Sequence, residues 1–76
     1  MRELLINIAK NLVEFPDAVT VEEEQREYTV VLKLRVAPED MGKIIGKQGR
    51  IAKAIRSVMK AAAIHDEKKV VVEIVQ

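Results

Sequence analysis

The stretch Ile44-Ile45-Gly46-Lys47-Gln48-Gly49-Arg50-Ile51-Ala52 decides how this chain is organised. Two glycines enclose two polar residues in it, and an apolar pattern with helical spacing lies on each side. Glycine at both ends of so short a segment lets the backbone bend sharply and lets another backbone approach it closely. If Gly49 begins a helix, the free N–H groups of its first turn carry a partial positive charge that suits a phosphate. We therefore interpret the stretch as a turn between two helices that can hold a nucleic-acid backbone, rather than as a catalytic site.

The composition predicts one small domain with charges that are separated along the chain. A length of 76 residues leaves room for a single domain, residues 1–76, and a hydrophobic content of 49% is enough for a core. The net charge of +1 is uninformative, because 13 basic residues nearly balance 12 acidic residues. Their positions carry more information, since a basic side is typical of a protein that binds a polyanion. The acidic group is Glu22, Glu23, Glu24 and Glu27, and the basic group is Lys43, Lys47, Arg50, Lys53, Arg56 and Lys60.

The sequence lacks the features that would indicate secretion or a membrane-spanning segment. There are no cysteines, so neither disulfides nor thiolate zinc sites are available. The first seven residues carry an acid and no long apolar block, which is unlike a secretory signal. No stretch has the length needed to span a bilayer. We expect a soluble cytoplasmic protein.

Hydrophobic periodicity predicts the order helix, strand, strand, helix, helix, strand. The first helix should end at Phe15-Pro16-Asp17, because proline disfavours helix in the residue before it. In the long helix we expect Ile51, Ala54, Ile55, Val58, Met59 and Ala62 to form the apolar side. The expected elements are 3–14, 19–23, 28–36, 38–45, 51–62 and 70–75. This pattern predicts an α/β fold of the α+β kind in two layers, with the helices on one face of a three-stranded sheet.

The element order and the glycine segment together resemble a KH domain of the prokaryotic arrangement, called type II. Ile45-Gly46-Lys47-Gln48-Gly49 matches the GxxG loop of that family, and the likeness covers nearly the whole chain. At this length the chain is similar to the small bacterial KhpA family, whose signature resembles the stretches 38–50 and 15–19. One position departs from the wider pattern: Ala52 stands where many KH domains have an aliphatic residue, and Ile51 lies one position earlier.

The resemblance implies a non-catalytic protein that holds about four nucleotides of single-stranded RNA. By resemblance, Gly46 and Gly49 allow close approach to phosphates, and Lys47 and Gln48 point at the RNA backbone from the loop tip. The implied cations beside them are Lys43, Arg50 and Lys53, and the implied apolar floor is Ile44 or Ile45. Without the resemblance, a plain helix-to-helix turn would explain the glycines equally well.

Other charged and aromatic residues carry less weight. Arg56 and Lys60 lie on what is the solvated face of any amphipathic helix, and Lys33 and Arg35 should face outward from the sheet without a role. The aromatic residues are Phe15, which we expect in the core, and Tyr28, which could be buried or free to stack. Proteins that hold single strands by stacking usually have more rings, so we expect weak, tolerant binding with a shallow salt dependence.

Catalysis and metal binding find little support in the sequence. His65 has no second histidine or cysteine to share a zinc ion, and Ser57 has no credible catalytic partners. The segment 42–48 fails as a nucleotide-binding P-loop, because its glycines are one residue too close and Gln48 replaces the magnesium-binding hydroxyl. We expect no enzyme activity, cofactor or metal.

The alternative class is a protein-interaction or dimerisation module with incidental RNA or single-stranded DNA binding. Outward valines of the sheet, Val31, Val71 and Val75, could form an apolar patch for such contacts. The two functions are compatible. The KhpA resemblance implies a partner of the KhpB kind, possible homodimers, and a role as RNA chaperone linked to cell elongation and the cell envelope.

Overall fold

The computed structural model describes residues 1–64 and 67–75, and within these ranges it leaves the side chain of Lys47 undescribed. His65 and Asp66 lie outside the described residues, and so does the expectation that His65 has no partner with which to hold a zinc ion. The elements follow the order that the sequence predicts. They are α1 (Arg2–Leu12), the short 3-10 helix η1 (Pro16–Ala18), β1 (Thr20–Gln25), β2 (Thr29–Arg35), α2 (Pro38–Ala62) and β3 (Lys69–Val75).

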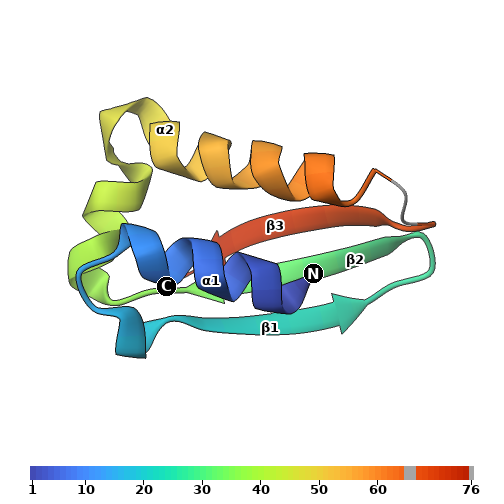
Figure 1. Cartoon of the computed structure of the whole chain (residues 1–76), viewed down its shortest axis with the longest axis horizontal. Coiled ribbons are helices and arrows are strands. Elements are labelled where there is room, and N and C mark those ends of the chain that lie inside the picture. Colours follow the sequence, from blue (N-terminus) through green and yellow to red (C-terminus); the bar gives the residue numbers. More distant parts are fainter. Residues whose placement is uncertain (65–66, 76) are drawn as a thin grey trace.

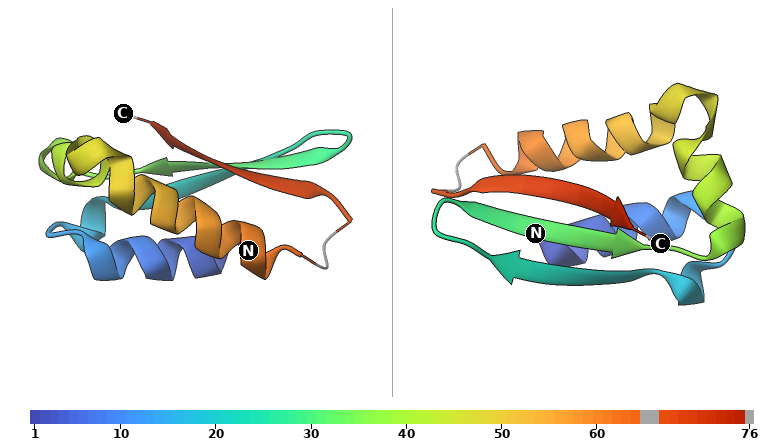
Figure 2. Two further views of the ribbon diagram at one scale, coloured as in Figure 1. Left: turned by 90° about the horizontal axis from the view of Figure 1, so that it is seen from above. Right: turned by 180° about the vertical axis from the view of Figure 1, so that it is seen from behind.

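The three strands form one mixed sheet in the order β1-β2-β3. β1 and β2 are antiparallel, with Val21 opposite Leu34, and β2 and β3 are parallel, with Leu32 opposite Val72. Because β2 and β3 run in the same direction, the chain between them must cross back over the sheet, and α2 makes this crossing. Figures 1 and 2 show that α1 and α2 lie on the same face of the sheet, so the fold has two layers.

The core lies between these helices and the sheet. Alternate strand residues point at the helices, and α1 contributes Leu5 and Ala9 from one side of its surface. The buried members of the core are Leu5, Ala9, Val19, Val21, Leu32, Leu34, Val36, Met41, Ile44, Ala52, Ile55, Met59 and Val72. At about 1.5–3 kcal/mol for each large apolar side chain, this set is the main source of stability for so small a domain.

α2 is assigned as one helix of 25 residues, but it changes direction inside the glycine segment (Figures 1 and 2). Gln48 has φ 64° and Gly49 has φ 70°, which are left-handed values that an α-helix cannot contain. The two predicted helices are therefore two arms of α2, a short arm before Gln48 and a long arm after Gly49. Pro38 starts the short arm, where its missing N–H costs no helical hydrogen bond.

The predicted apolar side of the long arm needs correction. Ala54, Val58 and Ala62 are exposed, whereas the buried residues are Ala52, Ile55 and Met59. The arm contacts the sheet along a narrow line, so it buries residues spaced by three and four positions instead of the full apolar stripe. The first helix also ends at Leu12, earlier than expected, and Phe15 is 45% exposed instead of belonging to the core.

Three polar side chains tie the helices to the rest of the fold. Asp40 is 1% exposed, and its carboxylate accepts hydrogen bonds from the backbone N–H groups of Glu14 (3.0 Å) and Phe15 (3.1 Å). Arg2 donates to the carbonyl of Val21 on β1 at 2.9 Å, and Arg56 donates to the carbonyl of Val72 on β3 at 3.3 Å. β1 and β3 are the two edges of the sheet, so each edge receives an arginine from a helix.

Candidate nucleic-acid interface

The glycine segment is partly open to solvent. Gly46 and Gly49 are half-buried and Gln48 is exposed. A Cβ built on either glycine would meet no atom within 4 Å outside its own stretch of helix. Gly49 needs the absence of a side chain for its left-handed φ as well, whereas Gly46 has no such conformational need. Gly46 therefore has room for a side chain, and neither its φ nor its surroundings require glycine there.

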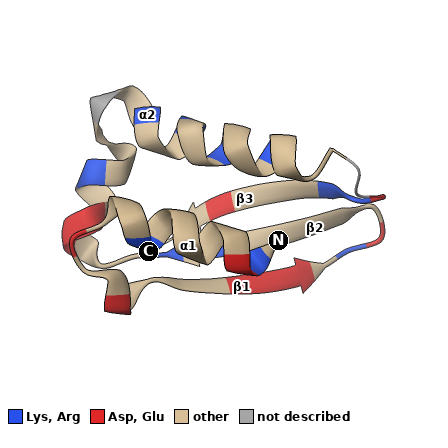
Figure 3. Cartoon of the chain, in the orientation of Figure 1, with Lys and Arg blue, Asp and Glu red and all other residues tan. Residues whose placement is uncertain are grey.

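Cations surround this segment on α2. Lys43, Arg50 and Lys53 are all exposed, and the first precedes the bend while the other two follow it. Figure 3 shows that Lys and Arg recur along α2 whereas acidic residues gather on the second half of β1, as the charge separation in the sequence predicts. Asp40 and Glu39 lie at the beginning of α2, so the short arm is not uniformly basic. The structure does not describe the side chain of Lys47, and its role stays a prediction.

Two isoleucines, Ile44 and Ile45, were expected to form an apolar floor for bases, but only one of them has an exposed side chain. Ile45 is 48% exposed, but Ile44 is 0% exposed and belongs to the core. The side chain of Ile44 therefore cannot touch a ligand in this structure, and its place in the expected site is corrected to a packing role. Helical geometry gives the reason, because residues one position apart point about 100° away from each other. Ala52, which departs from the wider KH pattern, is 4% exposed and is also part of the core.

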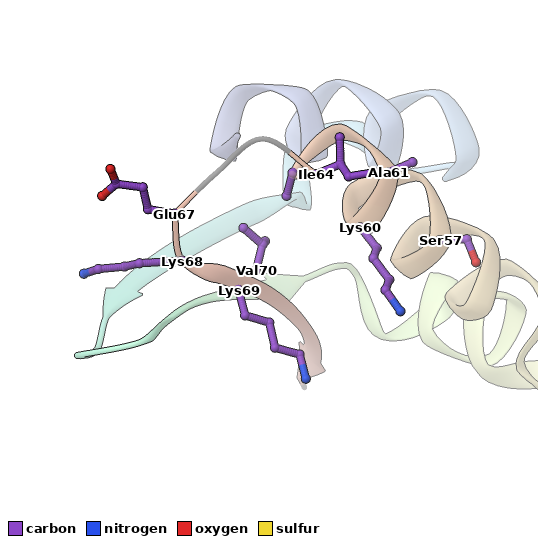
Figure 4. Close-up of a pocket in the computed structure, with 9 residues that line it drawn as sticks. Ser57, Lys60, Ala61, Ile64, Glu67, Lys68, Lys69 and Val70 are labelled. Carbon is purple, nitrogen blue, oxygen red and sulfur yellow. The ribbon is translucent and has the colours of Figure 1, made fainter.

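A hollow runs between the long arm of α2 and the edge strand β3. Its larger part has a volume of about 570 Å³, and its lining combines apolar residues such as Ile64 and Val70 with Lys60 and Lys69 (Figure 4). A second part of about 450 Å³ continues along β3 past Arg56 and shares Lys60, Lys69 and Val70 with the first. An apolar surface between cations can receive bases on its floor and phosphates on its rim.

Sequence reasoning missed most of this hollow. It gave Lys60 only a solvated role, and it left Ile64 and Lys69 without a role between the expected helix 51–62 and the expected strand 70–75. The signal was present in the two lysines of 68–71 that directly precede two valines, but their position beside α2 follows only from the parallel pairing of β2 and β3. For Arg56 the structure adds a role in packing, namely its hydrogen bond to the carbonyl of Val72.

The open face of the sheet is held by ion pairs. Glu24 on β1 lies 3.2 Å from Lys33 on β2 and accepts a hydrogen bond from Arg26 at 3.1 Å. The Arg26 guanidinium first, and then Lys33, hold the pKa of the Glu24 carboxyl below its ordinary value. Arg35 forms a further pair with Glu22 at 3.9 Å. Lys33 and Arg35 therefore face outward as predicted, and they face acids of the same sheet.

The apolar patch expected on this face is smaller than the sequence suggested. Val31 is 2% exposed, because the register places it between Glu24 and Val71 and beside charged side chains that cover it. Val71 and Val75 are half-buried. The expectation that Val31 contributes to an exposed patch is wrong.

In the described part of the chain, no helix combines the length and the apolar character that crossing a membrane requires.

Comparison with known proteins agrees with this geometry. The family model described as KhpA/KhpB, KH domain, matches residues 2–74. The chain belongs to the KhpA/KhpB family of KH domains. The RNA-binding protein KhpA of Clostridium acetobutylicum is 63% identical over 99% of this chain and all of that protein. The RNA-binding proteins KhpA of Listeria monocytogenes and Chlamydia trachomatis are 45% and 46% identical, over all of this chain and 100% and 97% of those proteins.

Among solved structures, Era of Aquifex aeolicus resembles the chain in fold. The TM-score is 0.67 over 96% of this chain and 28% of Era, with 21% sequence identity. This likeness concerns the fold alone. The family membership confirms the type II KH fold and agrees with the expectation of a binding protein instead of an enzyme.

Proposed function

We propose that this chain binds single-stranded RNA, with the segment Gly46–Gly49 on the sugar–phosphate backbone. The observation that carries the proposal is the uncovered backbone of this segment. Apart from its chain neighbours and the backbone of its own helix, neither glycine has an atom within 4 Å of where a Cβ would lie, and Gln48 and Gly49 have left-handed φ values that turn the chain there. Successive N–H groups in such a turn form a concave site for anions. The names of the relatives support RNA as the ligand.

The long arm of α2 gives the bound strand its direction. From the glycine segment, Arg50 and Lys53 offer positive charge along the arm, and the hollow beside β3 offers an apolar floor with Lys60 and Lys69 on its sides. Ile45 adds exposed apolar surface near the bend. We propose that the phosphates of about four nucleotides follow these cations while their bases face the hollow. Base recognition rests on aliphatic contact, because no aromatic ring lines the hollow among the described residues.

The test is the double substitution Lys47→Asp with Gln48→Asp. Aspartate tolerates the left-handed φ of Gln48 better than most residues do, so the fold should survive. A matched control is Asn7→Asp with Lys10→Asp, which exchanges one amide and one lysine for aspartate on exposed positions of α1. Circular dichroism checks both folds. We expect the loop variant to lose RNA binding in a gel shift while the control retains it; equal binding by the two folded variants would refute the assignment of the loop.

The cellular role follows from the family resemblance. We propose that the chain acts in the cytoplasm as an RNA chaperone, together with a second KH protein of the KhpB kind or as a homodimer, in regulation linked to cell elongation and the envelope. The family model that matches covers both KhpA and KhpB domains, which supports a shared RNA-binding function. Co-purification of a KhpB-like protein, compared between the wild type and the loop variant, tests whether partner and RNA use the same surface.

A further inference from the structure

The two most exposed large hydrophobic side chains among the described residues lie at the same end of the molecule. Tyr28 is 76% exposed and Ile64 is 75% exposed. Ile64 lines the hollow beyond the end of α2, and Tyr28 directly precedes β2. Surface side chains of this size usually keep part of their apolar area covered, so two uncovered ones together indicate a contact surface.

Backbone pairing brings Tyr28 to the end of the hollow. Its carbonyl accepts a hydrogen bond from the N–H of Lys69 at 3.1 Å, and Lys69 lines the hollow together with Lys68 and Ile64. The Nζ of Lys68 donates to the side chain of Gln25 at 3.1 Å, which ties this edge to the β1–β2 hairpin. The acidic members of the lining are Glu67 and, farther along β3, Glu73. They are outnumbered by the cations Arg56, Lys60, Lys68 and Lys69. The backbone of Tyr28, whose side chain is 76% exposed, thus lies beside a cationic, partly apolar hollow.

We propose that Tyr28 stacks on a nucleobase of the same RNA strand, outside the four nucleotides assigned to the glycine segment, while Lys68 attracts the adjoining phosphate. The inference rests on the proposed function and extends its footprint. From Arg50 to Ala62 the long arm of α2 rises about 18 Å, so a base at Tyr28 lies far from the phosphates at the loop. Stacking on one aromatic side chain accepts any base, because every base has a π-face. Tyrosine loses little rotamer freedom when it does so.

The composition of the chain supplies a direct reporter. Tyr28 is the single tyrosine and there is no tryptophan, so tyrosine fluorescence reports on this position alone. The wild-type protein is titrated with random-sequence RNA, once as a tetranucleotide and once as an octanucleotide, with N-acetyltyrosinamide as the reference for light absorbed by the RNA. We expect the octanucleotide to quench the emission beyond this reference and the tetranucleotide to leave it at the reference level.

Variants separate stacking from other effects. Tyr28→Phe keeps an aromatic face, and Tyr28→Leu keeps apolar bulk without one. Loss of one stacked base weakens binding by at least about fivefold, so we expect Tyr28→Leu to bind the octanucleotide at least about fivefold more weakly and the tetranucleotide as before. Tyr28→Phe should bind both as the wild type does. Because the side chain is mostly outside the core, both variants should fold, which circular dichroism checks.

Each outcome decides a different claim. Octanucleotide binding without quenching, or with equal affinity for Tyr28→Leu and the wild type, overturns this inference and leaves the proposed function intact. If Tyr28→Leu weakens binding of both lengths equally, Tyr28 belongs to the four-nucleotide site and the inference also fails. If the wild type binds neither RNA, the proposed function fails and the inference fails with it. An exposed ring that instead serves a protein partner would give no quenching with either RNA.

Discussion

Gly46→Ala should make the protein more stable and at the same time impair its binding of RNA. Gly46 has no left-handed φ, and a Cβ built there meets nothing within 4 Å outside the helix itself. Replacing a helical glycine with alanine then gains about 0.5–1 kcal/mol. For a domain of this size, that gain raises the melting temperature by roughly 2–8 °C. Thermal unfolding followed by circular dichroism measures it.

The same methyl group would occupy the space that a phosphate needs for close approach. Loss of a hydrogen bond from the backbone to a charged phosphate costs about 1.5–3 kcal/mol, which corresponds to a dissociation constant about 10- to 150-fold larger. Fluorescence anisotropy with a labelled single-stranded RNA measures this loss. A variant that is both more stable and unimpaired in RNA binding would refute the reasoning, because the openness at Gly46 would then serve no ligand.

Two further glycines provide controls on the same helix. Gly42 is exposed and also has open space around its missing Cβ, but it lies one turn before the segment. Gly42→Ala should therefore raise stability by a similar amount and leave RNA affinity unchanged. Gly49→Ala forces a side chain into φ 70°, and we expect a loss of about 1–2 kcal/mol of stability. A gain of stability in Gly46→Ala and a loss in Gly49→Ala would show that backbone strain requires glycine at Gly49 but not at Gly46.

Three other predictions follow from the structure. Asp40→Ala leaves two backbone N–H groups of the loop after α1 without their acceptor, and urea unfolding should show a loss of about 1–3 kcal/mol. The Glu24 carboxyl should titrate by NMR below its ordinary pKa. Its ion pairs therefore add a little to the stability of the fold above that ordinary pKa, and this stability is lost as the pH falls through the lowered pKa of the folded protein. In Arg26→Gln the titration should move upward, and an unchanged midpoint would contradict the pairing. The logarithm of RNA affinity should fall with the logarithm of salt concentration with a slope between roughly −2 and −3, and Lys53→Gln should reduce it by about 0.7; an unaltered slope would place Lys53 outside the contact.

The sequence predicted the fold because its strongest signals are local. The alternation in β2, the Phe15-Pro16-Asp17 boundary and the two helical patterns around Gly46 and Gly49 each depend on residues that are neighbours in the chain. Together with the order of elements, these signals determined the layers. The change of direction in α2 was also predictable, since glycine is the residue that most readily takes a left-handed φ.

The side chains at the site were harder to predict because burial depends on partners far away in sequence. Ile44 and Ile45 are equally apolar, and only packing on the sheet shows that Ile44 is buried while Ile45 is exposed. The concealment of Val31 depends on neighbours in β1 and β3. Phe15 was expected inside on hydrophobicity alone, but its short loop is fixed through backbone contacts to Asp40 and leaves the ring half exposed.

The central claim is that the open backbone from Gly46 to Gly49 contacts the RNA. Backbone amide resonances of a ¹⁵N-labelled protein, followed during titration with single-stranded RNA, test this claim residue by residue. We predict the largest shifts at the amides of Gly46, Gln48, Gly49 and Arg50, with smaller ones along the long arm of α2. Large shifts on the open sheet face, with those four amides unmoved at saturation, would contradict the account.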